Sequence, residues 1–568
     1  MSTSGNHSRW AFDDDMRLRQ GNELRLLLGG QVHNSSSSSA ATIRRSFAHT
    51  RRLGANAVLA PVSWALTEPQ EGVFDFDLVD TMIEEARRLS LRLVPLWFGA
   101  FKNAASTYAP RWVRADLERF PRAVVQAKVR GNAFHYSGVT PTPVLSVFSE
   151  NLRAADAAAF EAFLAHVAKV DATDVVAMVQ VENESGILRD SRDRSALAEE
   201  AWAGQVPSEL IVLARAGRAD SLLRELWTAH GERESGTWAE VFGEGSGADE
   251  VFMAWSIGSY VQHVAERGRV HRRVPMYTNA WLGPQPGQDE PGRWPSGGPA
   301  SRVVDVWRTA APSLSFVAPD IYVDDADSAM RVYTSHNQPF FVPESRLRAG
   351  ELVRAIGSYR AIGWSAFGID GANPDGQVAA VLTFLSALES DIAEAQRARR
   401  IGAVVVERGS SPAETRVGDL TVSARGLNDI VRTFLLDVGV QLPDAALPVP
   451  DETLPQEPVP TPGEQRPFAL VFAVADDELV VVGQGVKLDF ATSDGDVEID
   501  SVTELLVEKG ELVPGRVLNG DERLQVVPVD RVGAAKITLL RLSQNQWVRA
   551  VRPSVTEWRA GGGRGSGS

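Results

Sequence analysis

The chain has 568 residues, of which 44% are hydrophobic and 23% charged, as in ordinary globular proteins and unlike disordered or fibrous ones. Its net charge of -15 argues against a nucleic-acid scaffold, whose affinity for phosphate needs clustered cations. The sequence contains no cysteine, which excludes disulfides, thiolate zinc sites and cysteine nucleophiles. Because it has neither an apolar signal core nor a run of 18 apolar residues, we expect a cytoplasmic protein without a membrane span.

Short apolar runs alternate with amphipathic, helix-like stretches from residue 24 to about residue 371. Each run is apolar almost throughout, which is typical of parallel strands that are buried on both faces. Eight such strands separated by helices predict an α/β fold, a (β/α)8 TIM barrel. The eight runs are 24–31, 56–62, 92–98, 175–181, 274–279, 315–322, 339–344 and 365–370.

The predicted barrel spans residues 1–385 and includes a helical insertion at about 187–270, because the fourth and fifth runs are too far apart for one helix. We expect residues 386–560 to form a C-terminal antiparallel β domain, because two stretches after residue 467 alternate apolar and polar side chains between Gly and Asp turns. Within it, the acidic and proline-rich residues 442–467 predict a linker or surface loop. We expect the tail, 561–568, to be disordered.

Two of the predicted strands end in glutamate, the fourth at Glu182 and Glu184 and the seventh at Glu344. Active sites of such barrels lie at the carboxyl ends of the strands, so these carboxyls can face one another across one pocket. Cleavage of a glycosidic bond requires such a pair, one carboxyl protonating the leaving oxygen and the other attacking the anomeric carbon. A strand places Glu182 and Glu184 on the same face, so a kink at Asn183 would separate their side chains. The alternative role for these two carboxyls is to form salt bridges with arginines of the barrel.

Other side chains near strand ends can bind a sugar. The aromatic candidates, for which core packing is the alternative, are Trp64, Trp97, Trp281 and Tyr322. The polar candidates, which can instead be solvated, pair with arginine or cap a helix, are Glu68, Lys102, Asn103, Asn279, Asp320 and Asp370. His33 is the best placed of nine histidines, but these lack ligand spacing, so we expect no metal site and no cofactor.

The motifs VENE and VPE on the fourth and seventh strands resemble the retaining glycoside hydrolase clan with (β/α)8 barrels. LLLGGQVHNSSS, VQVENESG and MYTNAWLG, with GRVLNGDE in the C-terminal domain, are similar to glycoside hydrolase family 35. The similarity is to its bacterial β-galactosidase-like branch, which carries an uncharacterised C-terminal β domain. This resemblance implies that Glu184 is the acid/base, Glu344 the nucleophile and Asn183 a partner of the sugar 2-hydroxyl.

The sequence therefore predicts a retaining exo-glycoside hydrolase that cleaves terminal β-linked sugars by double displacement, with β-galactosidase-like specificity. The motifs TEPQEG and WFGAFKN depart from those of the family's galactosidases, so a β-glucosidase and an arabinopyranosidase stay as alternatives. A non-catalytic carbohydrate-binding protein is the alternative from another class. The expected partner is a small carbohydrate, not nucleic acid or a membrane, and a homo-oligomer is left open.

Overall fold

The computed structural model describes residues 9–126, 143–218, 221–407, 412–427, 430, 437–438, 466–493 and 495–543. Contacts divide the chain into two compact units at Glu389, with the parallel strands in the first unit and a large antiparallel sheet in the second. Nearly all of the proline-rich segment 442–467 and the whole of the tail 561–568 lie outside the described residues.

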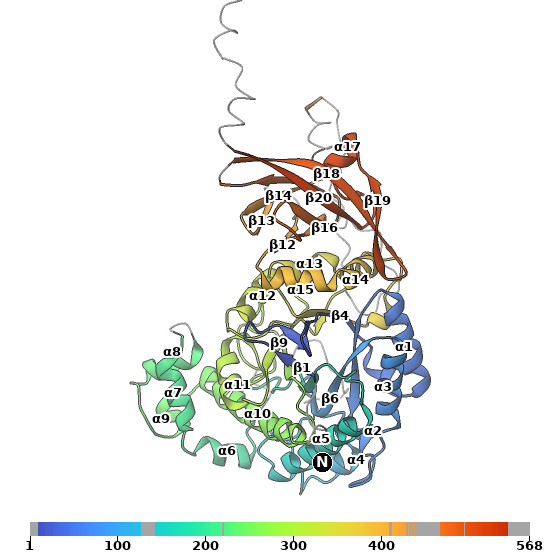
Figure 1. Ribbon diagram of the computed structural model, residues 1–568. Coiled ribbons are helices and arrows are strands. Elements are labelled where there is room, and N and C mark those ends of the chain that lie inside the picture. The colour runs from blue at the N-terminus through green and yellow to red at the C-terminus, as the bar shows by residue number, and fades with distance from the viewer. Residues whose placement is uncertain are drawn as a thin grey trace, which may run out of the picture. The chain divides into compact units, whose positions relative to one another are not determined.

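Eight parallel strands form the barrel of the first unit (Figure 1). Their hydrogen-bonded order is β10-β9-β8-β7-β6-β5-β4-β11, and a parallel bridge between Val342 and Trp364 closes the ring. The predicted TIM barrel is confirmed, with each strand at one of the eight apolar runs. The strands are β4 (Leu27–Gln31), β5 (Ala57–Ser63), β6 (Arg92–Lys102), β7 (Val179–Asn183), β8 (Met276–Trp281), β9 (Phe316–Ile321), β10 (Glu344–Ser345) and β11 (Gly363–Phe367).

Helices surround the strands because each buries one apolar stripe against the sheet. In α3 (Asp77–Arg88) the buried Val79, Met82, Ile83 and Ala86 recur at helical spacing. Serine caps begin two of the helices, since the side chains of Ser39 and Ser149 accept hydrogen bonds from backbone N–H groups three residues later. Besides α3, the helices around the barrel include α1 (Ala40–Arg52), which Ser39 caps, α2 (Trp64–Thr67), α4 (Arg111–Ala115), α5 (Glu150–Val170), which Ser149 caps, α10 (Ser246–Arg269), α11 (Val304–Ala310), α12 (Ala326–Thr334), α13 (Ala349–Gly357) and α14 (Gln377–Ala387).

The long connection between β7 and β8 is helical, as predicted. Four short helices precede α10 and stand to one side of the strands in Figure 1. The last helix of the connection, α10, packs against α5 and so belongs to the ring of barrel helices. The short helices are α6 (Ala196–Trp202), α7 (Ser208–Ala216), α8 (Leu222–Ala229) and α9 (Trp238–Phe242).

A small antiparallel sheet at the start of the chain was not predicted. It consists of β1 (Trp10–Phe12), β2 (Leu18–Gln20) and β3 (Glu23–Leu24). Trp10 and Leu18 belong to the same buried cluster as barrel residues such as Leu27 and Phe98. The indole N–H of Trp10 donates to the carbonyl of Asp174, which precedes β7, so this sheet covers the amino-terminal end of the strands.

The second unit contains a nine-stranded antiparallel sheet, which confirms the predicted β domain. Its order is β12-β15-β16-β20-β18-β17-β14-β13, with β19 paired to β18. Along β14, Leu420, Val422 and Ala424 are buried and alternate with more exposed residues, the pattern of a sheet with one core face. The strands are β12 (Ile401–Val405), β13 (Ala413–Val417), β14 (Leu420–Gly426), β15 (Phe468–Ala473), β16 (Glu478–Gln484), β17 (Val486–Ala491), β18 (Gly495–Glu508), β19 (Glu511–Val517) and β20 (Gly533–Ser543). Among the described residues, none of the helices has both the length and the hydrophobicity to cross a bilayer.

Candidate active site

The carboxyl end of β7 is sharply kinked. Glu182 and Glu184 both have left-handed backbone conformations, with φ of 61° and 42°, which are strained for residues other than glycine. The kink sends the two side chains apart. Glu182 accepts hydrogen bonds from the backbone of β6, whereas the Glu184 carboxyl lies within electrostatic reach of Glu344.

Glu344 begins β10 and is only 4% exposed, yet donors surround it. Its Oε1 accepts hydrogen bonds from the amide nitrogens of Asn183 at 3.2 Å and Asn279 at 3.5 Å. Its Oε2 accepts one from the hydroxyl of Tyr322 at 3.0 Å. The Nζ atom of Lys102 lies 4.0 Å from Oε1. A cation and three donors are thus directed at one buried carboxyl.

Lys102 also fixes the orientation of Asn183. Its Nζ donates to the Asn183 Oδ1 at 2.8 Å and lies 5.0 Å from the centre of the Phe98 ring. Because Oδ1 of Asn183 is occupied by this donor, the Nδ2 group of the same amide must point to Glu344. The lysine therefore acts on Glu344 both through its charge and through the amide between them.

Glu184 is suited to holding a proton. Burial, followed by the charge of Glu344, raises its pKa to about 7, although the charge of Lys102 opposes the shift. Asp320 on β9 is a third buried carboxyl in this group. Burial and the charges of Glu344 and Glu184 hold its pKa well above the usual range.

Asn279 near the end of β8 connects the carboxyls of Asp320 and Glu344 to the backbone of Glu184. Its Oδ1 accepts a hydrogen bond from the backbone N–H of Glu184 at 3.0 Å. Its Nδ2 donates to Asp320 at 2.6 Å and to Glu344 at 3.5 Å. The fourth barrel strand, β7, thus leads into Glu184, an acid that can give up a proton, and the seventh, β10, begins with Glu344, a carboxyl that accepts several hydrogen bonds. This combination suits general acid and nucleophilic chemistry at one centre.

Three of the predicted sugar-binding residues direct their polar atoms elsewhere. The indole N–H of Trp64 donates to Glu68 at 2.8 Å, and Glu68 also accepts from the backbone of Gly72. The indole of Trp97 donates to Asp156 on α5 and stacks on a phenylalanine of that helix. All three side chains are buried, and no hydrogen bond in the described part of the chain joins them to Glu184 or Glu344. Their contacts favour core packing.

The backbones at Trp281 and Asn103 adjoin the segments that carry Asp320 and Glu184. Trp281 ends β8 half-buried and is the register partner of Asp320 on β9. Asn103 follows β6 in a left-handed turn, with φ of 54°. The backbone N–H of the next residue, Ala104, donates to the carbonyl of Glu184 at 2.9 Å. The turn after the third barrel strand therefore supports the kinked end of the fourth.

Asp370 joins the loops after the first and eighth barrel strands. It accepts hydrogen bonds from the backbone and the ring of His33 at 3.0 and 2.8 Å, and from the hydroxyls of Ser36 and Ser46. Burial opposes ionisation, but the hydrogen bonds from His33 and Ser36 outweigh it and lower the Asp370 pKa. The contacts between His33 and Asp370 hold these two loops together. No group of three His, Cys, Asp or Glu side chains among the described residues is arranged to hold a metal ion.

Tyr277 and Trp364 are among the buried residues with unused polar atoms that escaped the sequence analysis. Tyr277 on β8 and Trp364 on β11 are completely buried, and the described residues offer no partner to the hydroxyl or the indole N–H. Burial, then the charges of Asp320 and Glu344, raises the Tyr277 pKa, which places its hydroxyl near the carboxyl group. Unpaired buried donors commonly mark a position for water or ligand. The sequence feature that could have identified Tyr277 and Trp364 is an aromatic side chain with a hydrogen-bond donor in or next to an apolar run.

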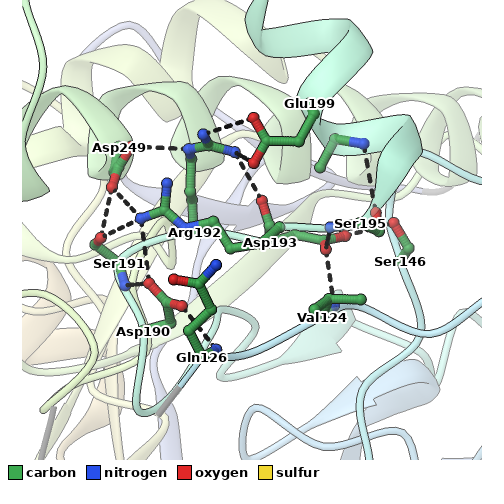
Figure 2. Close-up of polar contacts among 12 residues, drawn as sticks. Val124, Gln126, Ser146, Asp190, Ser191, Arg192, Asp193, Ser195, Glu199 and Asp249 are labelled. Atoms are coloured by element: carbon green, nitrogen blue, oxygen red, sulfur yellow. Dashed lines mark hydrogen bonds and ion pairs between the residues drawn. The ribbon is translucent and has the colours of Figure 1, made fainter. Parts of the chain in front are cut away.

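Buried charges hold the segment that follows Glu184 (Figure 2). Asp249 on α10 accepts hydrogen bonds from Ser191 and from the guanidinium groups of Arg192 and Arg194 at 2.5 to 3.0 Å. Arg192 also binds Glu199 on α6 through two parallel hydrogen bonds. A polar cavity of about 450 Å³ borders this cluster. The sequence analysis did not identify the network, because its members become neighbours only on folding.

Comparisons with known proteins match the two units separately. The model of glycoside hydrolase family 42, described as β-galactosidase, matches residues 33–228. A domain of unknown function, DUF5597, matches residues 378–529. No curated protein matches the chain. The first match agrees with the prediction of a glycoside hydrolase barrel, whereas the narrower resemblance to family 35 stays a prediction.

Solved structures with similar folds include two β-galactosidases and a β-amylase. The enzyme of the Antarctic haloarchaeon Halorubrum lacusprofundi has a TM-score of 0.42 and 16% identity, covering 66% of this chain and 58% of that one. The enzyme of the psychrophilic Marinomonas ef1 has a TM-score of 0.41 and 12% identity, covering 63% and 59%. The catalytic domain of the Paenibacillus polymyxa β-amylase has a TM-score of 0.39 and 12% identity, covering 62% and 95%. The chain spans less than two thirds of either β-galactosidase.

The network after Glu184 predicts a large difference between two of its acidic members. Asp249→Asn should lower the free energy of unfolding by about 3 to 5 kcal/mol, because two buried guanidinium groups lose a charged partner. Glu199→Gln, the matched control, should cost at most about 1 kcal/mol, since that carboxyl is 49% exposed. Urea unfolding followed by tryptophan fluorescence measures both values. Equal losses of unfolding free energy in the two variants would show that the buried network stabilises the fold no more than a surface ion pair does.

Proposed function

We propose that the chain is a retaining exo-glycoside hydrolase that removes terminal β-linked sugars, with β-galactosidase-like specificity. The observation that carries the proposal is the pairing of a buried acid with a carboxylate held by donors. Glu184 has its pKa raised to about 7, and Glu344 accepts hydrogen bonds from Asn183, Asn279 and Tyr322. The family 42 match over residues 33–228 supports the same reaction class.

The reaction follows from these two groups in two steps. The Glu344 carboxylate attacks the anomeric carbon while Glu184 gives its proton to the departing glycosidic oxygen, and a covalent glycosyl-enzyme forms. Glu184, now ionised, then takes a proton from water as that water attacks the same carbon. The ester bond to Glu344 breaks, and both carboxyls return to their starting states.

Neighbouring side chains have distinct parts in this reaction. Lys102 and Tyr322 stabilise negative charge on Glu344 before attack and after its release. Asn183 orients Glu344, and by resemblance to the retaining clan it binds the sugar 2-hydroxyl. Asn279 keeps the backbone of Glu184 in place. Trp281, beside Asp320, offers an aromatic face to the sugar.

The identity of the sugar is the least constrained part of the proposal. A β-glucosidase and an arabinopyranosidase use the same carboxyl pair and stay as alternatives, as does membership of family 35. A carbohydrate-binding protein without turnover has no need for an acid with a pKa of about 7. Turnover of a panel of nitrophenyl glycosides separates these cases, and no turnover of any β-glycoside would contradict the proposal.

Replacement of the proposed nucleophile should abolish turnover. Glu344→Gly removes the attacking carboxylate and leaves a space next to the anomeric carbon, so kcat on an activated aryl glycoside should fall below about a hundredth of the wild-type value. Azide should restore release of the aryl group by occupying that space. Asp370→Asn is the control, since Asp370 only holds two loops together through hydrogen bonds. This variant should keep most of the activity. Substantial activity of Glu344→Gly without azide would exclude the nucleophile assignment.

The acid role of Glu184 predicts a pH dependence. Because the proton must be present for leaving-group departure, activity on substrates with poor leaving groups should fall as the pH rises through about 7. Glu184→Gln should lose this alkaline limb and should be impaired least on activated aryl glycosides. Rate profiles from pH 5 to 9 for substrates of both kinds test the assignment. An unchanged alkaline limb in Glu184→Gln would assign the titration to another group.

A further inference from the structure

Glu182, the first glutamate of VENE, has no part in the proposed reaction, although its side chain is completely buried. Its Oε1 accepts a hydrogen bond from the backbone N–H of Ala100 at 3.1 Å, and its Oε2 accepts one from Phe101 at 2.7 Å. Both donors belong to β6, where the pairing with β7 shifts register between Trp97 and Lys102. The Glu182 carboxyl therefore supplies acceptors that the interrupted ladder lacks.

A second buried carboxyl, that of Asp156 on α5, meets the same backbone. Its Oδ2 accepts hydrogen bonds from the N–H of Ala100 at 3.2 Å and from the hydroxyl of Tyr260 at 2.7 Å. A Cβ atom added at Gly99 would lie 2.5 Å from Oε1 of Glu182 and 2.6 Å from Oδ1 of Asp156. The two carboxyls are therefore close neighbours, and glycine alone fits beside them.

The surroundings of these carboxyls provide hydrogen-bond donors but no ion pair. Neither Glu182 nor Asp156 forms a salt bridge in the described part of the chain, and both are completely buried. Two other titratable side chains lie within electrostatic reach of this pair, Tyr260 on α10 and Glu68. The positive charge of Arg153 on α5 lowers the pKa of Tyr260, against the larger effects of burial and of the two carboxyls. Burial, then the charge of Asp156, raises the Glu182 pKa well above its usual range. Two neighbouring buried carboxyls without a cation are poorly suited to carry two negative charges.

We propose that Glu182 and Asp156 share one proton, and that this pair positions the catalytic groups on both neighbouring strands. On β6 the pair fixes the irregular stretch that ends at Lys102, whose Nζ holds the amide of Asn183. On β7 it fixes the left-handed turn that leads to Glu184. Glu182 and Asp156 are positioning residues, and the positioning role rests on the proposed function.

The two carboxyls should differ in what their replacement removes. Each oxygen of Glu182 accepts a backbone N–H, so Glu182→Ala removes the carboxyl acceptor of both Ala100 and Phe101. In Asp156→Asn the remaining oxygen can still accept from the indole of Trp97, the amide nitrogen can donate to the Tyr260 hydroxyl, and Ala100 still donates to Glu182. Asp156→Asn therefore removes one carboxyl of the pair and leaves the backbone of β6 with its Glu182 acceptors.

Kinetics test the positioning role. Glu182→Ala should lower kcat about 100-fold, the cost of a displacement of about 1 Å, on substrates with good and poor leaving groups alike. Asp156→Asn should keep kcat within a few-fold of wild type and so serves as the conservative variant. Gly99→Ala should also lower kcat, because its Cβ would lie 2.4 Å from the indole nitrogen of Trp97 and 2.5 and 2.6 Å from the two carboxyls, which must then move. Gly247→Ala on α10, where the nearest atom is 3.5 Å away, should not. Wild-type kcat in either Glu182→Ala or Gly99→Ala would overturn the positioning role.

Infrared difference spectroscopy at neutral pH tests the shared proton without any reaction. One carbonyl band of a protonated carboxyl should shift or disappear, relative to wild type, in Asp156→Asn and in Glu182→Ala alike, because both residues hold the same proton. Asp171→Asn is the matched control, since that buried carboxyl is paired with Arg272 at 2.8 Å and its replacement should leave the band unchanged. A band that is unchanged in position and intensity in either Asp156→Asn or Glu182→Ala would overturn the proposal. If the wild-type protein cleaves no glycoside, the proposed function fails, and the infrared result still decides whether the proton is shared.

Discussion

Glu344 can act as a nucleophile only if it is ionised in a pocket that excludes nearly all water, and the rest of the site depends on meeting this constraint. A buried negative charge is costly unless it is paired and hydrogen-bonded. Lys102 supplies an opposite charge, and Asn183, Asn279 and Tyr322 supply hydrogen bonds. Asn279 also binds the backbone of Glu184, so the proposed nucleophile and acid are held by one amide and must move together.

The same cost of burying charge is met in other ways around the kinked end of β7. Asp249, in the network beyond Glu184, is neutralised by two arginines. Burial, followed by the charge of Glu344, raises the pKa of Glu184 to about 7, so that Glu184 can hold a proton. Glu182 and Asp156 have donors but no cation, which is the basis for their proposed shared proton. Carboxyls close in space thus reach different protonation states through their surroundings.

The sequence predicted the barrel and the two central glutamates because both depend on simple rules. Strands buried on two faces are apolar throughout, and barrel active sites lie at their carboxyl ends. Orientation at the strand ends could not be predicted in the same way. The register shift in β6 and the left-handed residues of β7 break the alternation of side chains, so Trp97 faces α5 and Glu182 binds backbone. The sheet formed by β1 to β3 escaped prediction because two or three residues carry no periodic pattern.

The central claim, that Glu344 attacks the sugar carbon directly, has a stereochemical consequence. If Glu344 forms a covalent intermediate and water then displaces it, two inversions leave the product with the anomeric configuration of the substrate. Proton NMR of the first sugar released from an aryl β-glycoside, recorded before mutarotation, reads this configuration. The account predicts that the β-anomer appears first. Initial release of the α-anomer would contradict it and would make Glu344 a base that acts through water.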